Sequence, residues 1–409
     1  MKVVVIGASH AGVGFVDAMR RRGFDGDLTL IDRQSGLPME RPPLSKAFLL
    51  DDGDEAKFAL RKPEWYRQCE VQLQDGCEVL TIDAAGHDLV LGNGRRMAYD
   101  RLVLAMGARP RHLPSTGNLD GVFVLRDPGD ARRLRAAASA AGSAIIVGGG
   151  YIGLEVAASL TRAGKKVTVI EAAPNLLARV ASRPISDFFR DLHCGQGVEV
   201  ITGSSVASVM EAGGRFTGVV LADGQRVAAD MLVVGIGVDP ETALAEQAGI
   251  ETANGIIVDQ DMRTNIAGIY AIGDGAMQRD GRYAIRLESV HNAQESAEIA
   301  AAAILGAAPP KRQAPWFWSD QFDLKLQSVG ILPEARDDLR HVRRAGRREN
   351  AFSVWSFRGP ELVAVEAVRD PAGYMAGKSC LENGMAPAPE QLADPDFDLK
   401  AFVADKQVA

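Results

Sequence analysis

The chain carries one strand–glycine–helix arrangement twice, and this repeat limits the folds open to it. VVVIGASHAG begins at Val3, and IIVGGGYIG begins at Ile145. In each copy a β-branched stretch runs into clustered glycines, then into helical apolar spacing, and then into a second apolar stretch. The copies are too far apart to be neighbouring units of a solenoid. The sequence therefore predicts an α/β protein with two Rossmann-like dinucleotide-binding domains.

The two copies align element by element. The predicted strand, helix and strand are Lys2–Ile6, Gly12–Arg22 and Leu28–Ile31 in the first copy, and Ala144–Val147, Ile152–Arg162 and Val167–Ile170 in the second. The aligned turn residues are Gly7 with Gly148, Ser9 with Gly150, Gly12 with Gly153, and the closing acids Asp32 with Glu171.

Such a turn suits a pyrophosphate, because it aims backbone N–H groups and the positive end of a helix at one point. The first glycine makes the turn, the second allows close approach of phosphate, and the third allows the helix to pack on the strand. The closing acid binds ribose hydroxyls. Ser9 departs from the pattern, although its small hydroxyl can itself donate to a phosphate. The alternative for either copy is a packed turn that binds no ligand. That both copies are such turns is less plausible than that one is.

Glu171 bears on the choice of nicotinamide cofactor. A carboxylate there repels a 2′-phosphate, and the following Ala172 and Ala173 supply no arginine to attract one. We expect the second site to prefer NADH over NADPH.

Composition narrows the class of protein. The 409 residues are 46% apolar and 24% charged, as in ordinary soluble globular proteins, and the net charge of −7 argues against general binding to nucleic acid or anionic membranes. No apolar run has the length of a membrane span. Gly7 and His10 interrupt the apolar stretch after Lys2 too early for a signal peptide. We expect a protein of a bacterial-type cytoplasm, with a monomer as the default oligomeric state.

The four cysteines are scattered. Cys69, Cys77, Cys194 and Cys380 form no CxxC pair and no zinc-like spacing, so we expect free, structurally passive thiols and no metal site.

The pattern changes from about Pro315. Strand-like stretches at Ser353–Phe357 and Leu362–Val368 precede a helical stretch at Ala372–Glu382, and Pro309, Pro310 and Pro315 mark a linker. A smaller C-terminal α+β domain is predicted.

Further motifs occur in a fixed order along the chain. They are ERPPLSK from Glu40, AMGARP from Ala105, GIGV from Gly235, YAIGD from Tyr270 and PWFWSDQ from Pro315. Together with the two turns, this set resembles the NADH-dependent ferredoxin reductases of bacterial oxygenase systems, the putidaredoxin reductase and biphenyl dioxygenase reductase type. The resemblance covers essentially the whole chain, and RPPLSK and PWFWSDQ are its most specific parts.

The resemblance implies a glutathione-reductase-like fold with three domains. These are a discontinuous FAD-binding domain (1–112 and 241–313), an NADH-binding domain (113–240) and a C-terminal domain (314–409). It also implies an activity: electrons pass from NADH through FAD, one at a time, to a [2Fe–2S] ferredoxin that feeds a cytochrome P450 or a Rieske-type oxygenase.

The resemblance also implies site residues. Lys46 and Glu155 are expected to meet beside the flavin, with Glu155 in the first turn of the second copy's helix; the alternative is two unrelated surface charges. FAD contacts are expected from Gly7, Ser9, His10, Ala11, Gly12, Asp32, Arg41, Lys46, Ala105, Gly107, Arg126, Gly273, Asp274, Val290 and Trp318. NADH contacts are expected from Gly148, Gly150, Tyr151, Ile152, Gly153, Glu155, Glu171 and Gly237.

Two of these regions carry more detailed expectations. Asp274 is expected at a helix start, where it accepts hydrogen bonds from the ribityl chain, caps the helix, or does both; a helix from His291 is expected to begin near the flavin. In the PWFWSDQ segment we expect Trp316 and Trp318 to point to opposite faces, one covering the flavin edge and one facing outward. Packing in the C-terminal core is the alternative for each tryptophan.

A basic run in the C-terminal domain has two interpretations. Its members are Arg336, Arg340, Arg343, Arg344, Arg347 and Arg348, offset by Asp337 and Asp338. In the simpler interpretation these arginines form a solvated strand–loop face. In the other interpretation they steer an acidic ferredoxin toward the protein.

The sequence allows more than one electron acceptor and more than one class of function. The stretch MERPPLSK contains no cysteine where relatives of glutathione reductase carry a redox pair, which argues against a thiol relay. Besides a ferredoxin, the same fold can serve rubredoxin, a quinone or oxygen. A third class is an NADH-sensing flavoprotein resembling apoptosis-inducing factor, although targeting and basic nucleic-acid-binding segments are absent from the sequence.

Overall fold

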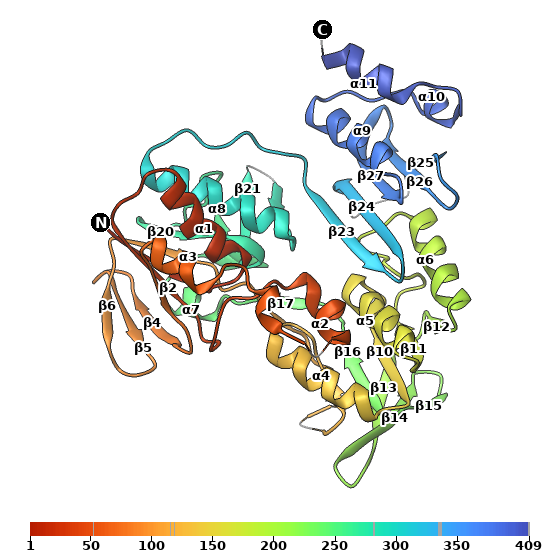
Figure 1. Ribbon diagram of the computed structural model, residues 1–409, viewed down its shortest axis with the longest axis horizontal. Helices are drawn as coiled ribbons and strands as arrows, with labels where there is room; N and C mark the ends of the chain where they lie inside the picture. Colours follow the sequence, from red (N-terminus) through yellow and green to blue (C-terminus); the bar gives the residue numbers. More distant parts are fainter. Residues whose placement is uncertain (52, 115, 118, 281–282, 334–337, 408–409) are drawn as a thin grey trace. The chain divides into compact units, whose positions relative to one another are not determined.

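The computed structural model describes residues 1–51, 53–114, 116–117, 119–280, 283–333 and 338–407 (Figure 1). Its contacts divide the chain into two compact units. The first contains Met1–Pro43, Asp52–Arg109 and Val238–Arg312, and the second contains Leu44–Asp51, Pro110–Gly237 and Gln313–Ala409.

The first unit is built on a five-stranded parallel sheet in the order β20-β7-β1-β2-β3. The strands are β1 (Lys2–Ile6), β2 (Asp27–Ile31), β3 (Val71–Gln74), β7 (Arg101–Leu104) and β20 (Ile269–Ala271). Strands β1 and β2 are buried over four consecutive residues, as expected of strands covered on both faces. Because β20 pairs with β7, the sheet is completed by chain that follows the second glycine turn.

Smaller elements complete this unit. The helices are α1 (His10–Arg21), α3 (Pro63–Gln68), α7 (Ala243–Gln247) and α8 (Val290–Leu305), with 3-10 turns at Glu55–Phe58 and Gly273–Gly275. One small sheet contains β4 (Val79–Asp83), β5 (Asp88–Leu91) and β6 (Arg96–Ala98), and another contains β18 (Thr252–Ala253), β19 (Gly255–Val258), β21 (Ala276–Asp280) and β22 (Tyr283–Ile285). Strands β8 (Ala108–Pro110) and β17 (Val238–Pro240) pair where the chain leaves and re-enters the unit.

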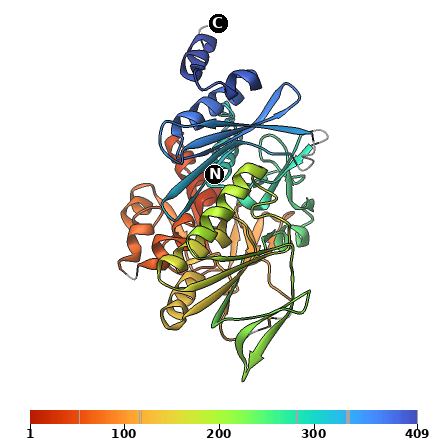
Figure 2. The same ribbon diagram turned by 90° about the vertical axis from the view of Figure 1, so that its right-hand side faces the viewer.

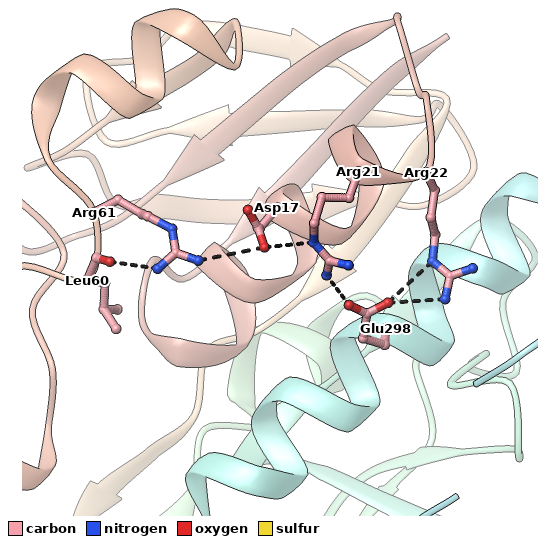
Figure 3. Close-up of polar contacts among 6 residues, drawn as sticks. All are labelled: Asp17, Arg21, Arg22, Leu60, Arg61 and Glu298. Atoms are coloured by element: carbon pink, nitrogen blue, oxygen red, sulfur yellow. Dashed lines mark hydrogen bonds and ion pairs between the residues drawn. The ribbon is translucent and has the colours of Figure 1, made fainter. Parts of the chain in front are cut away.

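An ionic network links α1 to α8 (Figure 3). Asp17 lies between Arg21, at 3.0 Å, and Arg61, at 3.6 Å, and Glu298 pairs with both Arg21 and Arg22, the latter at 3.1 Å. These residues come from the two ends of the unit's sequence. The network therefore stabilises contact between its discontinuous parts.

The second unit repeats the parallel sheet, in the order β12-β11-β10-β16-β9. The strands are β9 (Val122–Phe123), β10 (Ser143–Val147), β11 (Lys166–Glu171), β12 (Glu199–Thr202) and β16 (Met231–Val234). Its helices are α2 (Ala47–Leu50), α4 (Pro128–Ala140), α5 (Tyr151–Arg162) and α6 (Arg183–Gly195), with a 3-10 turn at Pro42–Ser45 leading into α2. A three-stranded sheet of β13 (Val206–Ala212), β14 (Arg215–Leu221) and β15 (Arg226–Ala228) extends it.

The C-terminal part of this unit is an antiparallel sheet in the order β23-β24-β27-β26-β25. Its strands are β23 (Trp316–Gln321), β24 (Leu324–Gly330), β25 (Leu339–Ala345), β26 (Phe352–Arg358) and β27 (Glu361–Val368), and the helices α9 (Pro371–Glu382), α10 (Pro389–Ala393) and α11 (Leu399–Gln407) follow. Figure 2 shows these helices on one side of the sheet and α6 on the other. Phe188 of α6 packs edge-on against Phe352, with ring centroids 5.0 Å apart.

The predicted fold class is confirmed, and the bounds given for the predicted strands and helices agree with the structure to within two residues, apart from the helix expected at Asp274. The sequence analysis gave no bounds for β23, β24 and β25 of the C-terminal sheet. The aromatic β23 and the arginine-rich β25 lack a clean apolar alternation. Of the residues described, no helix has the length and hydropathy needed to cross a bilayer.

We expect Glu298→Gln to lower the thermal unfolding midpoint by about 2 °C, because it removes the charge shared by two arginines, worth about 1 kcal/mol at this exposure. Calorimetry at low salt and in 1 M NaCl measures the effect, which should shrink at high salt. Glu64→Gln is the control, since Glu64 forms an exposed pair with Arg67 on one helix. Equal effects of the two substitutions would contradict a network role.

Candidate active site

The two glycine turns have nearly the same geometry. Gly7 has φ 106° and donates its N–H to Ile31 O at 2.8 Å, and Gly148 has φ 108° and donates to Ile170 O at 2.8 Å. A Cβ at Gly7 would lie 2.2 Å from Ala105 O, and one at Gly148 would lie 2.3 Å from Gly235 O. Both the backbone angle and the contact therefore require glycine.

The third glycine lets each helix pack onto its own turn. A Cβ at Gly12 would lie 1.9 Å from Gly7 O, and one at Gly153 would lie 2.1 Å from Gly148 O. The middle position is different. Gly150 has φ −80° with open space around a built Cβ, and Ser9 has φ −110°, so serine fits there without strain.

The acid that closes each copy binds the turn itself. Asp32 accepts hydrogen bonds from Ala8 N and Gln34 N, both at 2.8 Å. Glu171 accepts the equivalent bonds from Gly149 N at 2.6 Å and from Ala173 N at 2.8 Å. These bonds orient each carboxylate at the end of its strand, with lone pairs left for hydroxyl donors.

Both helices that follow the turns begin without a side-chain cap. The side chain of the N-cap residue Ser9 accepts no bond from the helix, the N-cap residue Gly150 has no side chain, and neither first turn contains an acid. In contrast, α4 has a capping box and α8 is capped by Ser289. Uncapped N–H groups at the positive end of a helix fit a bound pyrophosphate. In the first copy, Arg41 adds a cation, because its Nε donates to Ser9 Oγ at 3.2 Å.

Lys46 and Glu155 form an ion pair within the second unit. Lys46 Nζ lies 2.6 Å from Glu155 Oε2, and Ser45 Oγ donates to the same oxygen at 2.5 Å. The Glu155 side chain is 3% exposed, whereas that of Lys46 is 22% exposed. The helix begins at Tyr151, so Glu155 is its fifth residue and lies just beyond the first turn.

The RPPLSK motif carries Lys46 to this position. Its chain leaves the first unit after Pro43 and belongs to the second unit over Leu44–Asp51. Arg135 of α4 holds the segment, donating to Phe48 O at 3.2 Å and to Asp51 O at 2.6 Å while its guanidinium lies over the Phe48 ring. Ser159 of α5 donates to Ser45 O at 2.7 Å.

Comparison with known proteins identifies the family. The family described as pyridine nucleotide-disulphide oxidoreductase matches residues 1–297, and the family described as reductase C-terminal matches residues 316–403. The chain belongs to the pyridine nucleotide-disulphide oxidoreductase family.

Similar proteins match this oxidoreductase over its full length. Rhodocoxin reductase from Rhodococcus erythropolis is 40% identical over 99% of this chain and 95% of its own. The solved ferredoxin reductase for the CYP199A2 system of Rhodopseudomonas palustris is 37% identical with a TM-score of 0.94, covering 98% of this chain and 100% of that one. A chain in the crystal structure of the covalent putidaredoxin reductase–putidaredoxin complex is 34% identical with a TM-score of 0.94, covering 100% and 99%. The resemblance inferred from the motifs is confirmed.

The predicted FAD residues of the oxidoreductase divide between the two units. The first unit contains Gly7, Ser9, His10, Ala11, Gly12, Asp32, Arg41, Ala105, Gly107, Gly273, Asp274 and Val290, and the second contains Lys46, Arg126 and Trp318. Arg126 precedes α4, and its N–H donates to Asp130 Oδ2 at 2.8 Å. The predicted NADH residues, namely Gly148, Gly150, Tyr151, Ile152, Gly153, Glu155, Glu171 and Gly237, all lie in the second unit.

The helix expected at Asp274 is only a single 3-10 turn, and no α-helix begins there. Asp274 lies in the 3-10 turn Gly273–Gly275, and strand β21 follows. Gly275 packs against Gly107, whose carbonyl oxygen would lie 2.9 Å from a Cβ at Gly275. The later helix α8 begins at Val290, with Ser289 as its cap.

The expectation that Trp316 and Trp318 point to opposite faces is also wrong. Residues two apart on a strand share a face, and the two rings lie on one side of β23 with centroids 5.6 Å apart. The residues between and after them point the other way. Phe317 stacks on Tyr151 of α5 at 4.6 Å, and Ser319 bonds Glu155.

Much of the basic run of the oxidoreductase is engaged within the C-terminal domain. Arg340 pairs with Glu390 at 2.8 Å, Arg343 lies over the Phe352 ring at 4.1 Å, and Arg344 donates to the carbonyls of α10 and the following loop. Arg347 and Arg348 are exposed at a turn. Arg336 and Asp337 lie outside the described residues. These contacts favour a structural role for the central arginines.

The thiols of the oxidoreductase are free and dispersed. Cys380 is buried, and its burial raises the pKa of the thiol to about 11, which keeps it protonated at neutral pH. Cys69 and Cys77 are half-buried, and Cys194 is exposed on α6.

Sequence reasoning missed the polar residues that support Glu155. Ser45 and Ser319 donate to its carboxylate, and Gln321 and His193 continue the hydrogen bonds behind Ser319. The available signal was the alternation in PWFWSDQ, where Ser and Gln fall on the face of Phe317.

We expect Gly153→Ala to destabilise the second unit by about 3 kcal/mol, because the methyl group would lie 2.1 Å from Gly148 O. Gly150→Ser, which copies the first turn, should change stability little. Calorimetry with hydrogen-exchange mass spectrometry locates the effect to the second unit. If both variants behaved alike, the steric account of the turn would be wrong.

Proposed function

We propose that this chain is an FAD-dependent NADH:ferredoxin reductase. It passes electrons from NADH through FAD, one at a time, to a [2Fe–2S] ferredoxin that feeds a cytochrome P450 or a Rieske-type oxygenase. The observation that carries the proposal is the pair of matching dinucleotide turns, combined with the ion pair between the partly exposed Lys46 and the buried Glu155, which lies five residues beyond Gly150. Relatives named rhodocoxin reductase and ferredoxin reductase support the choice of acceptor.

Each turn has its own nucleotide in this proposal. The turn at Gly7, with Asp32 on the ribose and Arg41 beside the pyrophosphate, holds the ADP half of FAD. The turn at Gly148, with Glu171 on the ribose, holds NADH. When bound at the first turn, FAD would supply the chemistry that these residues lack, namely the acceptance of a hydride from NADH and the release of single electrons.

Lys46 and Glu155 act as a unit. The Lys46 ammonium supplies positive charge that stabilises negative charge developing at the redox centre. The Glu155 carboxylate orients the nicotinamide by accepting a hydrogen bond from its carboxamide, and it holds Lys46 in place. Burial of the Glu155 carboxylate strengthens its interactions, because few water molecules compete for it.

The assignment divides the chain into three domains by role. Residues 1–112 and 241–313 bind FAD, residues 113–240 bind NADH, and residues 314–409 complete the site. We place the protein in the cytoplasm as a monomer, without nucleic acid or membrane partners. The dispersed cysteines fit transfer by flavin alone.

The purified protein should be yellow, and its reduction of cytochrome c by NADH should require an added [2Fe–2S] ferredoxin. Treatment with iodoacetamide should leave this rate unchanged, because no thiol takes part. Colourless protein that takes up no FAD, or loss of turnover on alkylation, would contradict the proposal. Faster turnover with a rubredoxin than with any ferredoxin would assign the acceptor differently.

NADH should exceed NADPH in kcat/KM by at least about tenfold, or 1.4 kcal/mol, because Glu171 repels the 2′-phosphate. Glu171→Gln removes the charge while keeping an acceptor for the ribose, and it should narrow the ratio mainly by improving NADPH. Steady-state kinetics with both cofactors provides the measurement. A wild-type ratio of the two kcat/KM values near one would contradict this role of Glu171.

A further inference from the structure

A line of hydrogen bonds continues behind Glu155, on the side away from Lys46. Ser319 Oγ lies 2.7 Å from Glu155 Oε1, Gln321 Nε2 lies 3.2 Å from Ser319 Oγ, and His193 Nε2 lies 2.9 Å from Gln321 Oε1. Ser319, Gln321 and His193 are each fully buried. All these residues belong to the second unit.

The carboxylate fixes the direction of every bond in this line. An ionised Glu155 only accepts, so the Ser319 hydroxyl donates to it and must accept from Gln321. The Gln321 amide then turns its NH₂ group to Ser319 and its oxygen to His193. His193 must therefore carry its proton on Nε2 to donate to that oxygen.

The surroundings of His193 agree with this tautomer. Among the described residues, nothing bonds its buried Nδ1, so a proton there would lack an acceptor. Burial lowers the pKa of His193, which keeps the ring neutral through the physiological range. Phe322 packs edge-on against the ring with centroids 5.0 Å apart, which restricts its rotation.

The bonds at Glu155 leave its carboxylate with one acceptor position on Oε1. Ser45 and Lys46 occupy the two lone pairs of Oε2, and Ser319 occupies one lone pair of Oε1. The direction of the remaining lone pair is set by the Ser319 bond, because the carboxylate is planar.

We propose that Ser319, Gln321 and His193 are positioning residues for hydride transfer, holding the free lone pair of Glu155 toward the nicotinamide carboxamide. The inference rests on the function proposed above. It explains why β23 of the C-terminal domain places two polar side chains in a buried interface with α5 and α6, where apolar ones would avoid the cost of desolvation.

Rapid mixing of the FAD-loaded enzyme with NADH tests the proposal. Ser319→Ala should slow flavin reduction about tenfold, since a hydrogen bond to a charged group is lost, with FAD content unchanged. Ser319→Thr keeps the hydroxyl and should restore most of the rate. His193→Phe should slow reduction by a smaller factor, about threefold, and His193→Gln should recover it by restoring a donor.

Ser356→Ala is the matched control. Ser356 is a fully buried serine of the same sheet that bonds a histidine, His341, at 2.9 Å, but this pair is not linked to Glu155. It should lose similar stability without slowing flavin reduction. In a Glu155→Ala background, Ser319→Ala should have no further effect on the rate, because the group being positioned is gone.

The outcomes separate the two proposals. If the wild-type flavin is not reduced by NADH, the proposed function fails. If it is reduced but Ser319→Ala matches wild type, or slows the Glu155→Ala enzyme by the same factor as wild type, the positioning role is overturned. Slowing by Ser356→Ala equal to that of Ser319→Ala would overturn it as well.

Discussion

The arrangement of the second unit depends on keeping one charge out of water. The Glu155 carboxylate is 3% exposed, and such burial is tolerated only when donors replace the lost hydration. The donors come from Ser45 and Lys46 of the RPPLSK segment and from Ser319 of β23. This requirement explains why the chain sends Leu44–Asp51 into the second unit, and why a strand of the C-terminal domain runs beside α5.

The remainder of the candidate site uses backbone rather than side chains. Both glycine turns present uncapped helix N-termini, and each closing acid is bonded to the second residue of its turn. Such groups bind the parts common to all dinucleotides. In the function proposed here, discrimination and reactivity therefore depend on a few side chains, chiefly Arg41 in the first copy and Glu155 and Glu171 in the second.

The sequence predicted the turns because their requirements are local. A left-handed backbone angle at Gly7 and a helix packed on its own turn leave a pattern within ten residues. The meeting of Lys46 and Glu155 followed only from a family resemblance, since partners 109 residues apart leave no periodic signal. Ser319, Gln321 and His193 could not be recognised, because a buried polar residue is distinguished from a surface one only by its partner. The paired tryptophans were misplaced by misapplying the strand's period of two.

The separation of the donors along the chain has a consequence for synthesis. Glu155 leaves the ribosome 164 residues before Ser319, its most distant donor. A nascent nucleotide-binding domain can complete its parallel sheet and bury its apolar residues during that interval, yet its central carboxylate still lacks a ligand on one oxygen. The docking of β23 therefore comes last, and it supplies the Ser319 donor that the Glu155 carboxylate lacks until then.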